Sequence, residues 1–264
     1  MNKSKTMKSI EDIFLEFNKK GLIILKNILN EKEIRIINKK VQIIAENERK
    51  KSVACMYSPT YDEKITGQRV WNLINKDEIF REIIVKKEIL DFMEKIFDRE
   101  TVHQKFYLSS FQAHIVLPGS GAQKLHIDTP VPEPLPKWPI KANSIWALND
   151  FTESNGTTEY VEGSHKYTKK PCKGDESKYI IKKAIAPKGS VIITHGALWH
   201  RSGENRSSKS RIALLGSFAA SYAREIANEE DYSKVLSNEI LEGSKDTFKR
   251  IMGYGHGIKV GASY

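Results

Sequence analysis

Cysteine is scarce in this sequence, with two residues in 264. Cys55 and Cys172 are too few for a disulfide framework and lack CxxC spacing, which excludes a disulfide-stapled module. Long apolar runs are also missing: none approaches the roughly 20 residues that a membrane-spanning helix needs. The opening stretch MNKSKTMKSIEDIF contains no apolar run typical of a signal peptide. We therefore expect a cytoplasmic protein with no membrane partner.

Acidic residues are fewer than basic ones, 33 against 43, which gives a formal net charge of +10. A surplus of this sign can attract nucleic acid. The lysines, however, alternate with Glu and Asp in segments such as KSIEDIFLEFNKK, which is the pattern of a solvated helix face rather than a basic stripe. We therefore expect no nucleic-acid partner.

The chain up to about residue 100 has mainly helical patterns. Ser9 resembles an N-cap before an amphipathic series that Gly21 closes, and GLIILK then predicts a short buried strand. Asn30 is the expected cap of a longer helix, and a third helix is expected from about Asp77 to Phe97.

From about residue 101 to 220 the pattern changes to short β-rich runs, among them FYLSSFQAHIVL, TEYV, SVIITH and IALLGSF. Many short strands with turn residues between them indicate a sandwich or barrel. From about 221 to 264 a helical segment returns and ends in a Gly-rich tail. We expect a single domain over residues 1–264, mainly β, with N-terminal and C-terminal helices packed on the core.

The segment QKLHIDTP places His126 two positions before Asp128. Residues i and i+2 of a strand share a face, so this imidazole and carboxylate form half of a divalent-metal site. His200 follows a strand-like run further along the chain. Two histidines and one carboxylate form the facial triad of iron(II) oxygenases. Such a triad leaves positions for a 2-oxo acid and O₂, whereas a structural zinc site is closed and four-coordinate.

Arg211 adds a second argument for the same chemistry. A guanidinium matches a carboxylate with two charge-assisted hydrogen bonds, and 2-oxoglutarate needs such a partner for the carboxylate that does not reach the metal. Arg211 stands directly before the apolar run IALLGSF, where an inward charge needs an anionic partner. Ser202 could add a hydroxyl donor.

Three segments in this order resemble the phytanoyl-CoA dioxygenase (PhyH-type) family of Fe(II)/2-oxoglutarate-dependent oxygenases. They are LHIDTP, then IWALNDFTESNGTTEYVEGSH, then KGSVIITHGALWHRSG and the stretch to Arg211. The resemblance spans most of residues 100 to 220. The family usually has Pro where Glu162 stands and Asp where Ser190 stands, and neither departure touches an expected ligand.

The resemblance implies a double-stranded β-helix, that is, a cupin-like jelly roll, with the metal at its open mouth. It implies iron bound by His126, Asp128 and His200. It also implies that Arg211 and Ser202 hold the distal carboxylate of 2-oxoglutarate, with O₂ as the second cosubstrate.

Further site residues are expected on weaker grounds. Trp146 sits where the family often places an aromatic residue against 2-oxoglutarate, although a buried core tryptophan is an equal alternative. Arg69 occupies a position from which some members reach the cosubstrate. Gln112 and His114 share one face of a strand and, with Gln123, are the candidate substrate contacts.

The remaining histidines need separate assignments. His195 and His200 lie in one turn, and the family pattern assigns the metal to His200. His165 is expected to stabilise a turn, while His103 and His256 are expected to have no role at the metal.

The expected function is hydroxylation of an unactivated C–H bond in a small-molecule metabolite. One alternative is a metal-binding jelly roll without oxygenase activity, or a cupin-type zinc isomerase, in which Arg211 has no clear purpose. A nucleic-acid demethylase is another, but such enzymes usually carry a second arginine where Ser217 stands. The sequence does not identify the substrate or the oligomeric state.

Overall fold

The computed structural model describes residues 9–58, 60, 64–98, 105–223 and 236–254. Its main feature is an antiparallel sheet of seven strands in the order β1-β8-β5-β10-β4-β3-β2. The strands are β1 Leu22–Leu25, β2 Cys55–Tyr57, β3 Gly67–Val70, β4 Phe106–Val116, β5 Lys141–Ala147, β8 Val191–His195 and β10 Arg211–Ala220.

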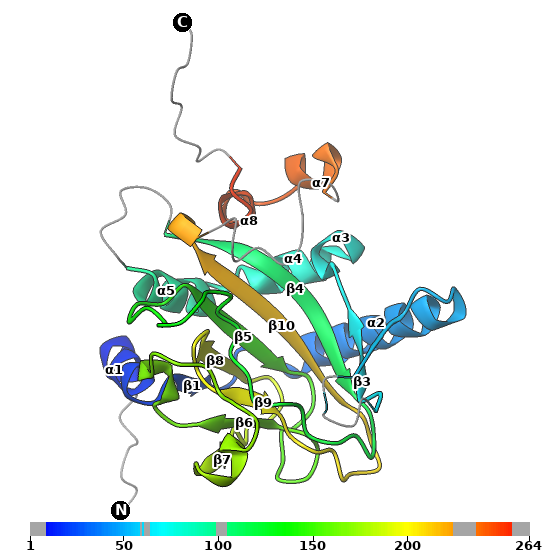
Figure 1. Cartoon of the computed structure of the whole chain (residues 1–264). Helices are drawn as coiled ribbons and strands as arrows, with labels where there is room; N and C mark the ends of the chain where they lie inside the picture. Colours follow the sequence, from blue (N-terminus) through cyan, green and yellow to red (C-terminus); the bar gives the residue numbers. More distant parts are fainter. Residues whose placement is uncertain (1–8, 59, 61–63, 99–104, 224–235, 255–264) are drawn as a thin grey trace, which may run out of the picture.

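A second, smaller sheet has the order β7-β6-β9 and is also antiparallel. Its strands are β6 Thr158–Val161, β7 Ile181–Lys183 and β9 His200–Ser202. Figure 1 shows this sheet on one side of the large sheet, with helices α2, α4 and α5 on the other. The two sheets form the expected jelly-roll core, and the fold is mainly β with flanking helices, as predicted.

The helices are α1 Ile10–Lys20, α2 Glu31–Lys50, α3 Leu73–Lys76, α4 Glu78–Ile84, α5 Lys87–Ile96, α7 Asn238–Glu242 and α8 Asp246–Ile251. Short 3₁₀ turns cover Ser164–Lys166, Asp175–Ser177 and Ser221–Ala223. Ser9 caps α1 in a capping box with Asp12, and Gly21 ends the helix in the left-handed region at φ 81°. Asn30 caps α2 in the same way. No helix in the described part of the chain is long and apolar enough to cross a membrane.

Two details of the predicted secondary structure are wrong. The single helix expected from Asp77 to Phe97 is two helices, because Lys86 adopts an extended conformation (ψ 131°) between α4 and α5. The first part of the chain is also less helical than expected, since besides the predicted strand β1 it supplies β2 and β3 to the large sheet. β2 is a short edge strand and β3 is a short strand between β2 and β4. Neither has the strict alternation that marks a half-buried strand.

The two faces of the large sheet have different partners. Toward the helices, Phe111 of β4, Trp146 of β5 and Leu214 of β10 join a large apolar cluster with Phe17 of α1 and Phe92 of α5. The opposite face looks toward the small sheet and lines a pocket. Because successive strand residues alternate between faces, the same strands supply both the core and the site.

Candidate metal centre and cosubstrate pocket

Three potential metal ligands converge at the mouth of the pocket. The main chains of His126 and His200 pair as an isolated antiparallel bridge, with both N–H···O distances at 3.0 Å. Nε2 of His200 lies 3.2 Å from Oδ2 of Asp128, and Nε2 of His126 lies 3.8 Å from Oδ1 of Asp128. All three ligand atoms lie within 4.8 Å of one another, so they can share one ion. The structure thus brings together the three residues predicted from two distant sequence segments.

Backbone carbonyls set the orientation of both imidazoles. Nδ1 of His126 lies 2.8 Å from the carbonyl oxygen of Lys124, and Nδ1 of His200 lies 2.9 Å from that of Leu198. A carbonyl oxygen only accepts, so each neutral ring carries its proton on Nδ1 and leaves the Nε2 lone pair for an ion. This arrangement is how proteins commonly orient histidine ligands.

The charges at the centre favour an ionised carboxylate. Burial by itself raises the pKa of Asp128, but the charge and the hydrogen bond of His200 outweigh it and hold that pKa well below its usual range. Burial opposes charge on His200 as well, yet Asp128 raises the pKa of this imidazole. Burial, followed by the charge of His200, lowers the pKa of His126. The centre is therefore an anion between two imidazoles, a donor set that suits iron, manganese or zinc rather than copper(I).

Asn143 on β5 supports this arrangement, and the sequence analysis missed it. Its Nδ2 donates to Oδ2 of Asp128 at 2.6 Å. An amide at this position holds the carboxylate in one orientation beside the imidazoles. No local signal marks Asn143, because it acts only after β5 has paired with its neighbours.

Arg211 opens β10 and is the principal cation of the pocket lining. Its side chain is 2% exposed, and burial lowers the pKa of the guanidinium to about 9. Nη2 donates to the Ser202 hydroxyl at 2.9 Å and to the carbonyl oxygen of Gly156 at 2.8 Å, while Nε has no partner. No carboxylate in the described ranges forms an ion pair with Arg211. A buried cation without an anion is costly, which indicates that a bound anion completes this site.

Gly156 lies in the middle segment of the family resemblance, IWALNDFTESNGTTEYVEGSH, which contains no predicted metal ligand. Its carbonyl oxygen also accepts from the Ser202 hydroxyl at 3.2 Å. Its φ is +76°, and a Cβ there would meet Val116, Asn205 and the carbonyl oxygen of Gly203 at 3.1–3.3 Å. Glycine at this position therefore lets the loop approach and hold both Arg211 and Ser202.

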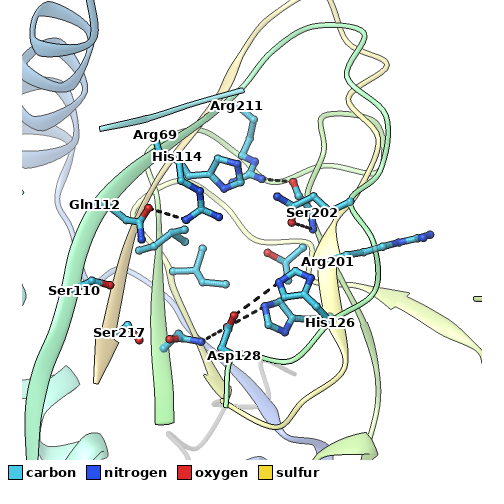
Figure 2. Close-up of a pocket in the computed structure, with 16 residues that line it drawn as sticks. Arg69, Ser110, Gln112, His114, His126, Asp128, Arg201, Ser202, Arg211 and Ser217 are labelled. Carbon is cyan, nitrogen blue, oxygen red and sulfur yellow. Dashed lines mark hydrogen bonds and ion pairs between the residues drawn. The ribbon is translucent and has the colours of Figure 1, made fainter. Parts of the chain in front are cut away.

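Four other predicted residues also line the pocket. Arg69 donates to Oε1 of Gln112 at 2.7 Å and packs over the ring of Tyr57. His114 is 4% exposed, its Nε2 has no partner, and burial followed by the charge of Arg211 lowers its pKa well below the usual value. Oε1 of Gln123 accepts from the Ser202 amide at 2.9 Å, so Gln123 joins the loop to β9. Figure 2 shows His114 beside Arg211, at the opposite end from Asp128.

Two further assignments, those of Trp146 and His195, concern residues that do not line the pocket. Trp146 is fully buried among the residues facing the helices, and its Nε1 donates to Ser144 at 3.0 Å. The structure therefore places it in the core, the alternative that the sequence left open. His195 lies at the end of β8 with its ring 5.1 Å from that of His165, away from the three ligands. His103 and His256 lie outside the described residues.

The fold and the donor set define a jelly-roll protein with a three-ligand metal site beside a buried arginine. The sequence profile described as Phytanoyl-CoA dioxygenase (PhyH) matches residues 17–213. The chain belongs to this family, which confirms the resemblance seen in its motifs.

Two relatives illustrate how far the similarity extends. "Dioxygenase af480" of Aspergillus fumigatus is 28% identical over 204 residues, which are 76% of this chain and 63% of the relative. "Dioxygenase FUM3" of Gibberella moniliformis is 25% identical over 265 residues, covering 93% of this chain and 82% of the relative. The chain thus spans less than two thirds of the first relative's length.

Solved structures show the same fold at low sequence identity. The non-heme alpha ketoglutarate dependent carbocyclase SnoK from nogalamycin biosynthesis superposes with a TM-score of 0.66 at 17% identity, covering 87% of this chain and 93% of SnoK. The epimerase SnoN, in complex with Fe³⁺, alpha ketoglutarate and nogalamycin RO, gives a TM-score of 0.64 at 14% identity and covers 80% of this chain and 83% of SnoN.

Proposed function

We propose that this chain is an iron(II)- and 2-oxoglutarate-dependent dioxygenase that hydroxylates an unactivated C–H bond of a small-molecule metabolite. The observation that carries the proposal is the buried guanidinium of Arg211, which has no carboxylate partner among the described residues and lines the same pocket as the His-Asp-His cluster. A metal site alone does not explain a buried cation. A diacid that reaches from the metal to Arg211 explains both.

In this proposal His126, Asp128 and His200 hold the iron. Their chemistry would fit iron, because two imidazole nitrogens and one carboxylate oxygen are the donor set of non-haem iron(II) oxygenases. Bound iron supplies the activation of O₂. Asn143 holds the carboxylate by its hydrogen bond, and the carbonyls of Lys124 and Leu198 hold the imidazoles.

The Arg211 end of the pocket binds the distal carboxylate of 2-oxoglutarate. Ser202 and the Gly156 carbonyl keep the guanidinium in place, and its free Nε remains available to donate. His114 was expected to contact the substrate, but its unpartnered Nε2 stands at this end and is better suited to contact the cosubstrate. Arg69 remains a candidate cosubstrate contact and Gln112 a candidate substrate contact, because both line the pocket.

Relatives named dioxygenases support the reaction class. The similarity to SnoK, titled a carbocyclase, and to SnoN, titled an epimerase, shows that this fold serves several outcomes. We keep hydroxylation of a metabolite as the proposed outcome, with desaturation, cyclisation and epimerisation as the alternatives, and the carboxylate of Asp128 argues against halogenation. A nucleic-acid substrate is not proposed, since Ser217 stands where demethylases usually carry an arginine.

The test is anaerobic reconstitution with Fe(II), followed by addition of 2-oxoglutarate and O₂ and measurement of succinate. We expect succinate with the natural chain and none with His126→Ala, whose fold is checked by circular dichroism. His165→Ala is the matched control, because this histidine lies outside the metal cluster. A metabolite that increases succinate formation identifies the substrate class.

Two outcomes would contradict the proposal. Tight zinc binding at the triad, without succinate and without 2-oxoglutarate binding, would favour a metal-binding jelly roll or a cupin-type isomerase. Salt-sensitive binding to single-stranded nucleic acid, with succinate formation coupled to it, would favour a demethylase.

A further inference from the structure

The end of the pocket away from Arg211 contains a row of small polar side chains. Ser217 of β10 pairs in register with Ser110 of β4 on one side and with Asn143 of β5 on the other. All three line the pocket, and they are 5%, 0% and 8% exposed. Figure 2 shows Ser110 and Ser217 at the level of Asp128, with Arg211 at the far end. We call this row, Ser110–Ser217–Asn143, the hydroxyl row after its two serines.

The hydroxyl row lies too far from Arg211 to serve the same ligand. Arg211 and Ser217 stand six positions apart on β10, and a strand rises about 3.3 Å per residue, so about 20 Å of strand separates them. A five-carbon diacid is much shorter than this span. If 2-oxoglutarate occupies the Arg211 end, the hydroxyl row faces whatever binds on the other side of the metal.

The hydroxyl row lies next to the metal centre, on the side away from Arg211 (Figure 2). Asn143 is hydrogen-bonded to Asp128. Ser217 is the neighbour of Asn143 on the adjacent strand, about 5 Å away in the hydrogen-bonding direction. A group that Ser217 holds is therefore close to the position at which the substrate reacts. The next row along the sheet, Gln112–Leu215–Ile145, has larger side chains. The small serines thus leave the room that a ligand group needs.

Ser217 lacks a hydrogen-bond partner despite its burial. Its Oγ is among the buried polar atoms without a partner, and a buried hydroxyl left unsatisfied destabilises the protein. The hydroxyl row contains no charged side chain to pair with an ionic group, and the neighbouring carboxylate of Asp128 is already held by Asn143 and His200. A ligand group that satisfies Ser217 is therefore neutral and hydrogen-bonding rather than ionic or purely apolar.

We infer that the substrate carries a neutral oxygen, as a hydroxyl or carbonyl group, which Ser217 binds within the hydroxyl row next to the reacting carbon. The inference rests on the proposed function, because the row is assigned to substrate only if 2-oxoglutarate takes the Arg211 end. It favours oxygenated compounds over plain hydrocarbon chains.

The test uses simple ring fragments on the protein loaded with Mn²⁺ and 2-oxoglutarate. The probes are cyclohexanol, methylcyclohexane, cyclohexanecarboxylate and cyclohexylammonium, and the measurement is paramagnetic relaxation of their NMR signals, with Zn²⁺ as the diamagnetic reference. We expect cyclohexanol to bind near the metal more tightly than the other three. Ser217→Ala should weaken its binding about five- to tenfold, the value of one neutral hydrogen bond.

Thr194→Val is the matched control. Thr194 belongs to the same register row, opposite Asn143, and its Oγ1 is also buried without a partner, but it does not line the pocket. Its substitution should leave cyclohexanol binding unchanged. Melting temperatures of both variants check that the fold is retained.

The outcomes separate this inference from the proposed function. Calorimetry of 2-oxoglutarate on the same samples tests the proposed function by itself. If 2-oxoglutarate binds but Ser217→Ala leaves cyclohexanol unaffected, if a charged or apolar fragment binds better, or if no fragment approaches the metal, the inference is overturned. If 2-oxoglutarate does not bind, the proposed function fails first and the assignment of the row fails with it.

Discussion

Two pairs of neighbouring histidines in this protein, each with its rings tilted to one another, lie at similar spacing but differ in chemistry. The rings of His126 and His200 are 4.6 Å apart, and those of His165 and His195 are 5.1 Å apart. The first pair shares the carboxylate of Asp128, and the pKa of His200 is raised. The second pair has no carboxylate in a metal-binding cluster, as far as the described residues extend, and burial lowers the pKa of His195 to about 3.

The difference shows that close imidazoles do not by themselves make a metal site. In the first pair both Nδ1 atoms face backbone carbonyls, so both Nε2 atoms are left for an ion. In the second pair Nδ1 of His195 accepts from the amide of Ala197 at 3.0 Å, and Nε2 of His165 faces the carbonyl of Asn18 at 3.1 Å. Backbone partners and one carboxylate thus separate a ligand pair from a packing pair.

The largest expected effect comes from removing the carboxylate, which makes the first pair resemble the second. Asp128→Ala should weaken Mn²⁺ binding by more than about 100-fold, because changes around a ligand alone cost about 10- to 100-fold. Calorimetric titration of Mn²⁺ measures this. His195→Asn is the control and should bind Mn²⁺ like the natural chain, whereas a loss of affinity there would remove the distinction between the pairs.

Arg211 is the next feature that distinguishes the surroundings of the first pair. Arg211→Met should weaken 2-oxoglutarate binding about 100-fold or more, since removing one partner of a buried charge pair costs about 2–5 kcal/mol. The same change should leave the melting temperature of the ligand-free protein equal or higher, because it removes a buried charge that has no anion. Calorimetry and thermal denaturation test the two parts, with Arg206→Met as the exposed control. A large drop in melting temperature would mean that Arg211 is mainly structural.

A smaller effect is expected from the support of the carboxylate. Asn143→Ala removes the 2.6 Å hydrogen bond to Asp128 and should weaken Mn²⁺ binding about tenfold, at the lower end of the range for such residues. Asn38→Ala, on α2, is the control for loss of an asparagine away from the site. An unchanged affinity would show that the two imidazoles alone orient the carboxylate.

The smallest expected effect is on the pH dependence of stability, and it comes from His195 of the second pair. The folded pKa of His195 is about 3 and the unfolded value is about 6.5. Below about pH 6.5 the unfolded chain therefore binds a proton at His195 that the folded chain does not bind until about pH 3. Stability is fully present above pH 6.5 and falls as the pH decreases toward 3.

His195→Asn should remove that part of the loss, because asparagine can accept from the Ala197 amide and does not titrate. Melting temperatures at pH 7 and about pH 5.5 should differ by about 2–4 °C less in the variant than in the natural chain. Buried His114 and half-buried His165 also have lowered pKa values and remain in both proteins. Equal differences in the two proteins would show that His195 does not set the acid sensitivity.

Much of the fold could be predicted because its signals are local. The caps at Ser9 and Asn30 and the left-handed Gly21 are recognisable from a few neighbouring residues. The break at Lys86 could not be predicted in this way, since an apolar pattern continues through it on both sides. The short strands β2 and β3 were missed because pairing with neighbouring strands, β3 with β4 and β2 with β3, supplies most of what makes them strands.

The sequence by itself determined the ligand types, the order of the family motifs and the presence of an arginine before an apolar strand. Only the tertiary structure decided which residues meet: Asn143 with Asp128, Gly156 with Arg211, and Trp146 in the core instead of the pocket. The physical reason is that residue type and periodicity are properties of a segment. Contact across a site depends instead on strand register, which hydrogen bonds between distant segments establish.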